Sequence, residues 1–70
     1  MEIISTPNSS NLNKVEYDGK DLYVTFKSGG TYRYDSVPRS IFEGFITAPS
    51  AGRYFHMNVK GRYPYRKIKG

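Results

Sequence analysis

The segment LYVTFKSGGTYRY (residues 22–34) decides the fold of this chain. Apolar and polar side chains alternate on both sides of its central Ser-Gly-Gly, and a period of two is typical of half-buried β-strands. The same alternation occurs in residues 13–17, before a turn at residues 18–21 in which Gly19 can take a positive φ. We therefore expect a three-stranded antiparallel meander.

The length of the second loop determines which side chains face inward. A three-residue loop over residues 28–30, with its last glycine in the left-handed region, sets Tyr32 and Tyr34 beside Phe26 and Val24. A two-residue loop would turn both tyrosines to the other face, so we expect the three-residue loop. The buried face then consists of apolar and aromatic side chains: Val15, Tyr17, Leu22, Val24, Phe26, Tyr32 and Tyr34.

Two short helices are expected after the meander. The first starts at residues 35–38, because Pro38 suits the first helical position and Asp35 or Ser36 can cap it. Its apolar stripe is spaced for a helix and consists of Val37, Ile41, Phe42, Phe45 and Ile46.

Ser50 is expected to cap a second helix over residues 51–58, with Phe55 and Val59 facing inward. The order of elements predicts an α+β fold, with both helices on one face of the meander and an extended basic C-terminal segment.

A chain of 70 residues has room for one domain. Residues 1–12 are rich in Ser and Asn and suggest a loose lead-in, residues 13–65 form the domain, and residues 66–70 form a basic tail. The absence of Cys excludes disulfides and thiolate metal sites. The first residues lack the pattern of a signal peptide, and no apolar run approaches the length of a membrane span. We therefore expect a cytoplasmic protein.

Basic side chains are concentrated in the last third of the chain. Residues 1–48 carry six acidic and five basic side chains, whereas residues 49–70 carry six basic side chains and no acidic one. Such asymmetry favours a polyanionic partner, although a basic tail can also serve only solubility.

The order of motifs resembles the KTSC family, short domains that occur as a C-terminal appendage of some lysyl-tRNA synthetases and as stand-alone bacterial and phage proteins. The motifs that carry the resemblance are Val15-Glu16-Tyr17-Asp18, Leu22 to Phe26, Gly29 to Tyr34, Val37-Pro38, Ser50 to Phe55 and Tyr63. The resemblance covers residues 9–65, with Tyr32-Arg33-Tyr34 at its centre, and His56 stands where the family pattern has Asn. The association with a synthetase implies RNA binding.

Catalytic and metal sites are not expected. The chain has one His, no Cys and no cluster of carboxylates, and Asp18, Asp21 and Asp35 occupy turn or cap positions. A site centred on His56 would lack a second titratable group beside it, so we expect no enzyme and no cofactor.

Phosphate binding has two candidate sites. The first is the helix start at Ser50, Gly52 and Arg53, where free N–H groups, an accessible backbone and a guanidinium can meet an anion. In the alternative reading, Ser50 only caps the helix and Gly52 only avoids a clash.

The second candidate is the C-terminal segment, where aromatic and basic residues interleave as in proteins that bind single strands. We expect Tyr63 to be buried and Tyr65 to be exposed. The remaining candidates in this segment are Lys60, Arg62, Arg66 and Lys67. A weaker third surface is the outer sheet face, with Tyr23, Arg33 and Lys14.

Two functions remain open from the sequence. The first is a non-enzymatic module that binds RNA or another single-stranded nucleic acid. The second is a stand-alone accessory protein of phage or plasmid type, which binds a small nucleotide signal or a protein partner and can form a homo-oligomer.

Overall fold

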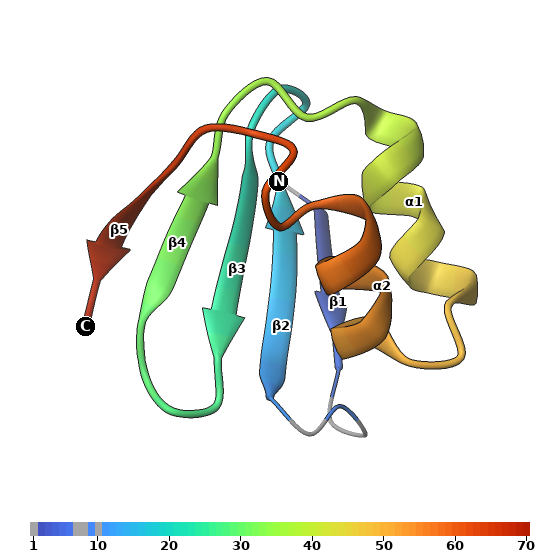
Figure 1. Ribbon diagram of the computed structural model, residues 1–70, viewed down its shortest axis with the longest axis horizontal. Helices are drawn as coiled ribbons and strands as arrows, with labels where there is room; N and C mark the ends of the chain where they lie inside the picture. The colour runs from blue at the N-terminus through green and yellow to red at the C-terminus, as the bar shows by residue number, and fades with distance from the viewer. Residues whose placement is uncertain (1, 7–8, 10) are drawn as a thin grey trace.

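The computed structural model describes residues 2–6, 9 and 11–70, and these form a five-stranded antiparallel sheet and two helices (Figure 1). The strands follow one another in the sheet in the order of the sequence. No helix in the described part of the chain is long and apolar enough to cross a membrane. The elements are β1 (Glu2–Ser5), β2 (Leu12–Tyr17), β3 (Leu22–Phe26), β4 (Thr31–Tyr34), α1 (Arg39–Thr47), α2 (Ala51–Asn58) and β5 (Tyr65–Lys69).

The α+β class is confirmed, but the expected three-stranded meander is wrong because both edges carry a further strand. β1 lies in the segment expected to be a loose lead-in and pairs with β2. β5 lies in the expected C-terminal tail and pairs with β4. Both are edge strands with little burial: Ile3 is 58% exposed, and all five residues of β5 are exposed. Backbone pairing therefore holds these strands together with one inward contact each, Ile4 of β1 against the core and Tyr65 of β5 against Tyr34.

The first hairpin has the expected register, with Tyr17 opposite Leu22. The second hairpin keeps the expected face but is shifted by two residues. Val24 lies opposite Tyr32, and Leu22 lies opposite Tyr34. The loop consists of residues 27–29, because the N–H of Phe26 donates to the carbonyl of Gly30 at 3.0 Å.

Both loops contain three residues, so the parity and the inward face of the tyrosines are the same in each. Gly29 takes φ 92° and Gly30 takes φ 130°, so either glycine satisfies the turn. The cross-strand packing of larger side chains selects between them.

The core lies between the sheet and the two helices. Tyr17 stacks on Phe42 with the ring centroids 5.1 Å apart, and its hydroxyl donates to the carbonyl of Val37 at 2.6 Å. This bond satisfies the only polar atom of a side chain that is 3% exposed. The buried core residues are Leu12, Val15, Tyr17, Leu22, Val24, Tyr34, Val37, Phe42, Phe45, Phe55 and Val59.

α2 has the expected bounds, with Phe55 and Val59 buried, and the Ser50 side chain accepts a hydrogen bond from the N–H of Arg53. α1 begins later than expected, after Pro38, and has no side-chain cap. The Asp35 carboxylate is bound instead to the Arg33 guanidinium at 3.0 Å.

Ile46, expected in the apolar stripe of α1, is 65% exposed. It lies at the edge of a shallow hollow that is also lined by Ile4 and Ser5 of β1 and Ala51 of α2.

Gly44 determines how closely the two helices approach each other. A Cβ atom at Gly44 would overlap the phenol ring of Tyr54, which packs on Phe45 with the ring centroids 4.7 Å apart. The Tyr54 hydroxyl donates to the carbonyl of Ile41 at 2.8 Å. In Figure 1 both helices lie toward the β1 edge, and β4 and β5 extend beyond them. One end of the inner sheet face is therefore not covered by a helix.

Candidate nucleic-acid interface

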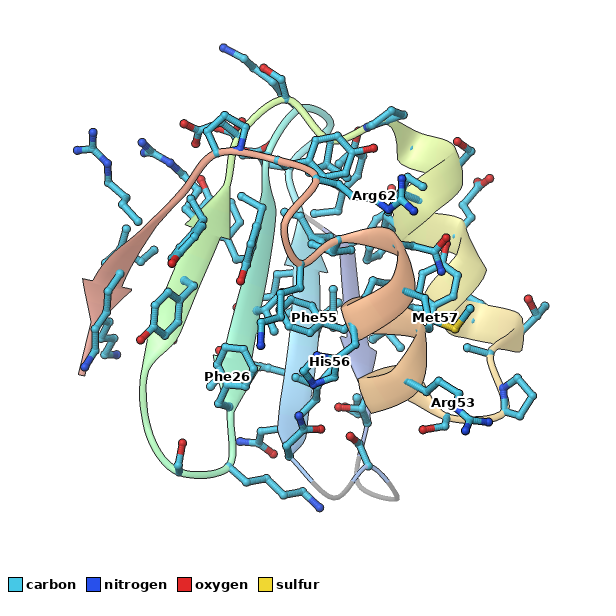
Figure 2. All side chains as sticks on the ribbon, viewed as in Figure 1. Phe26, Arg53, Phe55, His56, Met57 and Arg62 are labelled. Carbon is cyan, nitrogen blue, oxygen red and sulfur yellow. The ribbon has the colours of Figure 1, made fainter. Side chains whose placement is uncertain are left out.

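A pocket of about 310 Å³ opens where the inner sheet face emerges from beneath α2. The strands β3, β4 and β5 supply one part of its wall, and α2 supplies the other. Figure 2 shows Phe55 and His56 on α2 facing toward Phe26 on β3. We call this hollow the aromatic pocket, after its five rings: Phe26, Tyr32, Tyr34, Phe55 and Tyr65.

The rings contact one another along the pocket. Tyr34 and Tyr65 stack with centroids 5.3 Å apart and planes 28° apart. Phe55 meets both Tyr34 and Phe26 edge to face, each at 5.5 Å, and Phe26 meets Tyr32 in the same way. The rings therefore form one continuous aromatic surface across three strands and a helix.

The exposure of the rings increases with their distance from the core. Tyr34 and Phe55, nearest the core, are 4% and 2% exposed, whereas Tyr65 is 61% exposed. Burial, and then the neighbouring Tyr65 and Tyr32, raise the pKa of Tyr34 to about 12. The inner part of the aromatic pocket therefore favours neutral groups, and the outer ring is available for stacking.

Positive charge surrounds these rings. Lys60, which follows α2, lines the aromatic pocket and is exposed. Lys67 lies opposite Tyr32 and on the same face as Tyr65, since alternate residues of a strand share a face. No Asp or Glu lines the aromatic pocket, and every carboxylate of the chain is described by the structure. The rim is therefore basic.

Hydrogen-bonding side chains complete the lining. Three residues supply them: Asn11 just before β2, Ser28 in the β3–β4 loop, and His56 on α2. Their amide, hydroxyl and imidazole groups can donate and accept hydrogen bonds. The lining thus combines stacking surfaces with a few polar groups, as ligand sites commonly do.

The candidate phosphate site at the start of α2 is separate from the aromatic pocket. Arg53 is exposed and lines a different hollow with Tyr54 and Met57, and in Figure 2 it points away from Phe26 and Phe55. Gly52 is buried, and a Cβ atom there would lie 2.5 Å from Asn11 Oδ1. The space in front of Gly52 is therefore taken by the Asn11 side chain, and Ser50 acts as the cap of α2.

The candidates of the C-terminal segment divide between two faces. Tyr65 lines the aromatic pocket, and Lys67 lies on the same face of β5 next to it, whereas Arg66 lies opposite Arg33 on the other face of the sheet. Arg62 donates from its Nε atom to the carbonyl of Met57 at 2.9 Å. Tyr63 packs against the core in a half-buried position, close to the expectation.

Four rings of the aromatic pocket were expected only as core residues. Their positions in the sequence have the periodicity of core residues, and this periodicity does not show whether a ring also lines a pocket. The four are Phe26, Tyr32, Tyr34 and Phe55. Tyrosine at two successive inward positions of β4 was the available clue, because a hydroxyl in a closed core needs a partner. The described residues contain no group of three or more His, Cys, Asp or Glu side chains that could hold a metal ion.

Comparisons with known proteins agree with this architecture. The family model of the KTSC domain matches residues 8–63. A lysine–tRNA ligase of Trichormus variabilis is 34% identical over 64 residues, which are 89% of this chain and 11% of that protein. An uncharacterized protein of Stutzerimonas stutzeri is 38% identical over 63 residues, with 86% of this chain and 89% of that protein covered.

A solved structure has the same fold. The crystal structure of a KTSC domain protein from Yersinia pestis superposes with a TM-score of 0.84 at 34% sequence identity, covering 96% of this chain and 99% of that one. The chain thus spans about a tenth of the ligase it matches but nearly the whole length of the two smaller proteins. The match to the family model over residues 8–63 and the superposition on a solved KTSC domain protein show that this chain belongs to the KTSC domain family.

Proposed function

We propose that this protein is a small, non-enzymatic binding module for single-stranded nucleic acid, RNA above all, and that the aromatic pocket is its site. One observation carries the proposal. Five aromatic rings form a continuous row from the core to the 61% exposed Tyr65, and the pocket that they line contains the basic Lys60 and no carboxylate. Proteins that bind single strands combine stacking rings with cations that meet the phosphates.

The sheet is a suitable support for such a site. Single-stranded RNA is commonly read by aromatic side chains on an exposed sheet, where unstacked bases lie flat on the rings. Here the half-buried Tyr32 on β4 and the exposed Tyr65 on β5 have ring centroids 6.0 Å apart on such a sheet, and the buried Tyr34 supports Tyr65 from beneath. Stacking contributes roughly 1–3 kcal/mol per base, so one or two bases on these rings would provide measurable affinity.

The relatives add support for RNA. Several are lysine–tRNA ligases, and that name refers to an RNA. The net charge of +5 and the basic last third of the chain favour a polyanion in the same way. This function places the protein in the cytoplasm, where RNA is available.

The test measures binding of a fluorescein-labelled single-stranded oligoadenylate to the full chain by fluorescence polarisation at low salt. Replacing Tyr65 by Ala should weaken binding by roughly 5- to 150-fold, the range that corresponds to the loss of one stacked base. Tyr65 is 61% exposed and stacks on Tyr34, so this change should lower stability by only about 0.5–1.5 kcal/mol and leave the chain folded at the temperature of the assay.

Matched controls come from the opposite sheet face. Arg66 neighbours Lys67 on β5 but points to the other side, so Lys67→Gln should weaken binding and Arg66→Gln should have little effect. Equal losses in both variants would show that diffuse charge, and not the aromatic pocket, binds the strand. If no oligonucleotide binds at low salt, the proposal is wrong, and a protein partner becomes the better explanation of this surface.

A further inference from the structure

The two lysines at the rim allow a sharper statement about the ligand. We infer that the aromatic pocket accepts one internal nucleotide of a strand, with Lys60 binding the phosphate on one side of the ribose and Lys67 binding the phosphate on the other. This inference rests on the proposed function and specifies its ligand. An internal nucleotide has phosphates on both its 5′ and 3′ oxygens, whereas a free di- or triphosphate nucleotide carries them in one chain.

Lys60 approaches from the helical wall. It directly follows the last turn of α2, and its backbone N–H donates to the carbonyl of Phe55 at 2.9 Å. Phe55 is the ring of α2 that contacts both Phe26 and Tyr34. The backbone of Lys60 is therefore held against the helical wall of the aromatic pocket, while its long side chain is free to follow a phosphate.

Lys67 approaches from the opposite side, at the outer edge of the sheet. It lies opposite Tyr32 in the β4–β5 ladder. Its Cε atom lies 3.5 Å from the position that a Cβ atom would take at Gly30. The stem of Lys67 thus lies beside Gly30, the residue that follows the β3–β4 loop, on the side where Cε1 of Tyr32 also lies within 3.8 Å of that Cβ position.

The aromatic surface lies between the two lysines. β5 and α2 stand on different sides of β3 and β4 in Figure 1, and the rings of Tyr32 and Phe26 lie on those two central strands. A base stacked on this surface would have one ammonium group on each side. Two cations that approach from opposite sides match two phosphates that leave a ribose in opposite directions, and they match a single pyrophosphate chain poorly.

No competing charge disturbs this arrangement. Four acidic side chains form ion pairs with Lys14, Arg33 or Arg39, none of which lines the aromatic pocket. The Asp18 carboxylate accepts hydrogen bonds from its own turn. Each rim lysine is therefore available to a phosphate, and each phosphate bound to a single strand changes the slope of log affinity against log salt by about 0.7.

The first experiment compares nucleotides that differ in the number and placement of their phosphates. Adenosine 3′,5′-bisphosphate, ADP, 5′-AMP and 3′-AMP are titrated into the labelled full chain, and binding is followed by amide chemical shifts. We expect the bisphosphate to bind about tenfold more tightly than ADP, since only the bisphosphate reaches both lysines with charge-assisted hydrogen bonds. ADP binding as tightly as the bisphosphate, or no binding by any of the four at millimolar concentration, would overturn the inference.

The second experiment assigns each lysine to one phosphate. Lys60→Gln should remove the advantage of one of the two monophosphates over adenosine, and Lys67→Gln should remove the advantage of the other. With the oligoadenylate, each variant should flatten the salt slope by about 0.7, and Arg66→Gln should not change it. If both variants affect the same monophosphate, the two lysines share one phosphate chain and the inference is wrong.

The two proposals fail in different ways. Loss of oligonucleotide binding from the unaltered protein removes the nucleic-acid function itself. Oligonucleotide binding that depends on Tyr65 but shows no difference between adenosine 3′,5′-bisphosphate and ADP would preserve the function and reject only the placement of two phosphates.

Discussion

Replacement of Gly44 by Ala tests the packing that leaves the aromatic pocket uncovered. In the interior of an exposed helix, Gly→Ala ordinarily stabilises by about 1 kcal/mol because alanine has the higher helix propensity. Gly44 is different, because an added Cβ atom would lie 2.7 Å from Cε1 of Tyr54 and closer still to two other atoms of its phenol. The Tyr54 ring would have to move, and the helix–helix contact with it.

The expected loss follows from the contacts that Tyr54 makes. Its hydroxyl donates to the carbonyl of Ile41 at 2.8 Å, a bond worth about 1 kcal/mol net. Its ring packs edge to face on Phe45 at 4.7 Å, worth roughly 0.5–1.5 kcal/mol beyond burial. Some burial of the ring is lost as well, and the gain in helix propensity offsets part of the total. We expect a net loss of about 1–2 kcal/mol, within the usual range for overpacking.

The assay is urea and thermal unfolding of the Gly44→Ala variant, each followed by circular dichroism. Each kcal/mol lost should lower the thermal midpoint by roughly 4–8 °C in a domain of this size. The matched control is the same substitution in a Tyr54→Ala background, where the ring is absent and Gly44→Ala should stabilise by up to about 1 kcal/mol. A Gly44→Ala variant that is stabilised in the presence of Tyr54 would refute the helix packing described here.

Three further predictions concern single residues and one strand. Hydrogen bonds from the backbone N–H groups of Asp21 and Lys20 lower the pKa of Asp18, so the native state binds fewer protons than the unfolded chain at low pH. The free energy of unfolding should therefore fall as the pH drops below the ordinary aspartate pKa of about 3.9. Urea unfolding should show a smaller fall for the Asp18→Asn variant than for the unaltered protein, and an equal fall would contradict this assignment. Since the pKa of Tyr34 is raised to about 12, stability should decrease as the pH rises above the ordinary tyrosine value of about 10. The Tyr34→Phe variant should lose less over that range, and identical profiles would show that Tyr34 is not buried. Truncation after Tyr65 removes most of β5 and uncovers the edge of β4. The truncated chain should stay folded but associate more than the full chain in analytical sedimentation. A monodisperse truncated protein would show that β5 does not protect this edge.

The periodicity of the sequence was sufficient for the central strands. Alternation in residues 22–26 and 31–34 identified which side chains face inward, because a period of two leaves only two choices. The sequence also predicted the capped helix after Ser50, because its cap, its bounds and its inward residues depend on local sequence. The family resemblance rested on the same segments and is confirmed.

The edge strands could not be recognised in this way. β1 and β5 have little apolar periodicity of their own, and each forms because a neighbouring strand offers unpaired backbone groups. The same dependence on partners explains the second hairpin, where two glycines permit two registers of equal parity and only cross-strand packing distinguishes them.

The aromatic pocket depends most on tertiary structure. The sequence determined that Phe26, Tyr32, Tyr34 and Phe55 point to one face, but a face becomes core or site according to what covers it. The contact between Gly44 and Tyr54 fixes how the helices pack together, and they lie toward the β1 edge, so the rings at the far end stay open. Pairing of β5 with β4 then brings Tyr65 and Lys67 beside those rings, although more than thirty residues separate them from the nearest ring of β4 along the chain. Burial is a property of the assembled layers, and for that reason only the tertiary structure could turn a row of predicted core aromatics into a candidate binding surface.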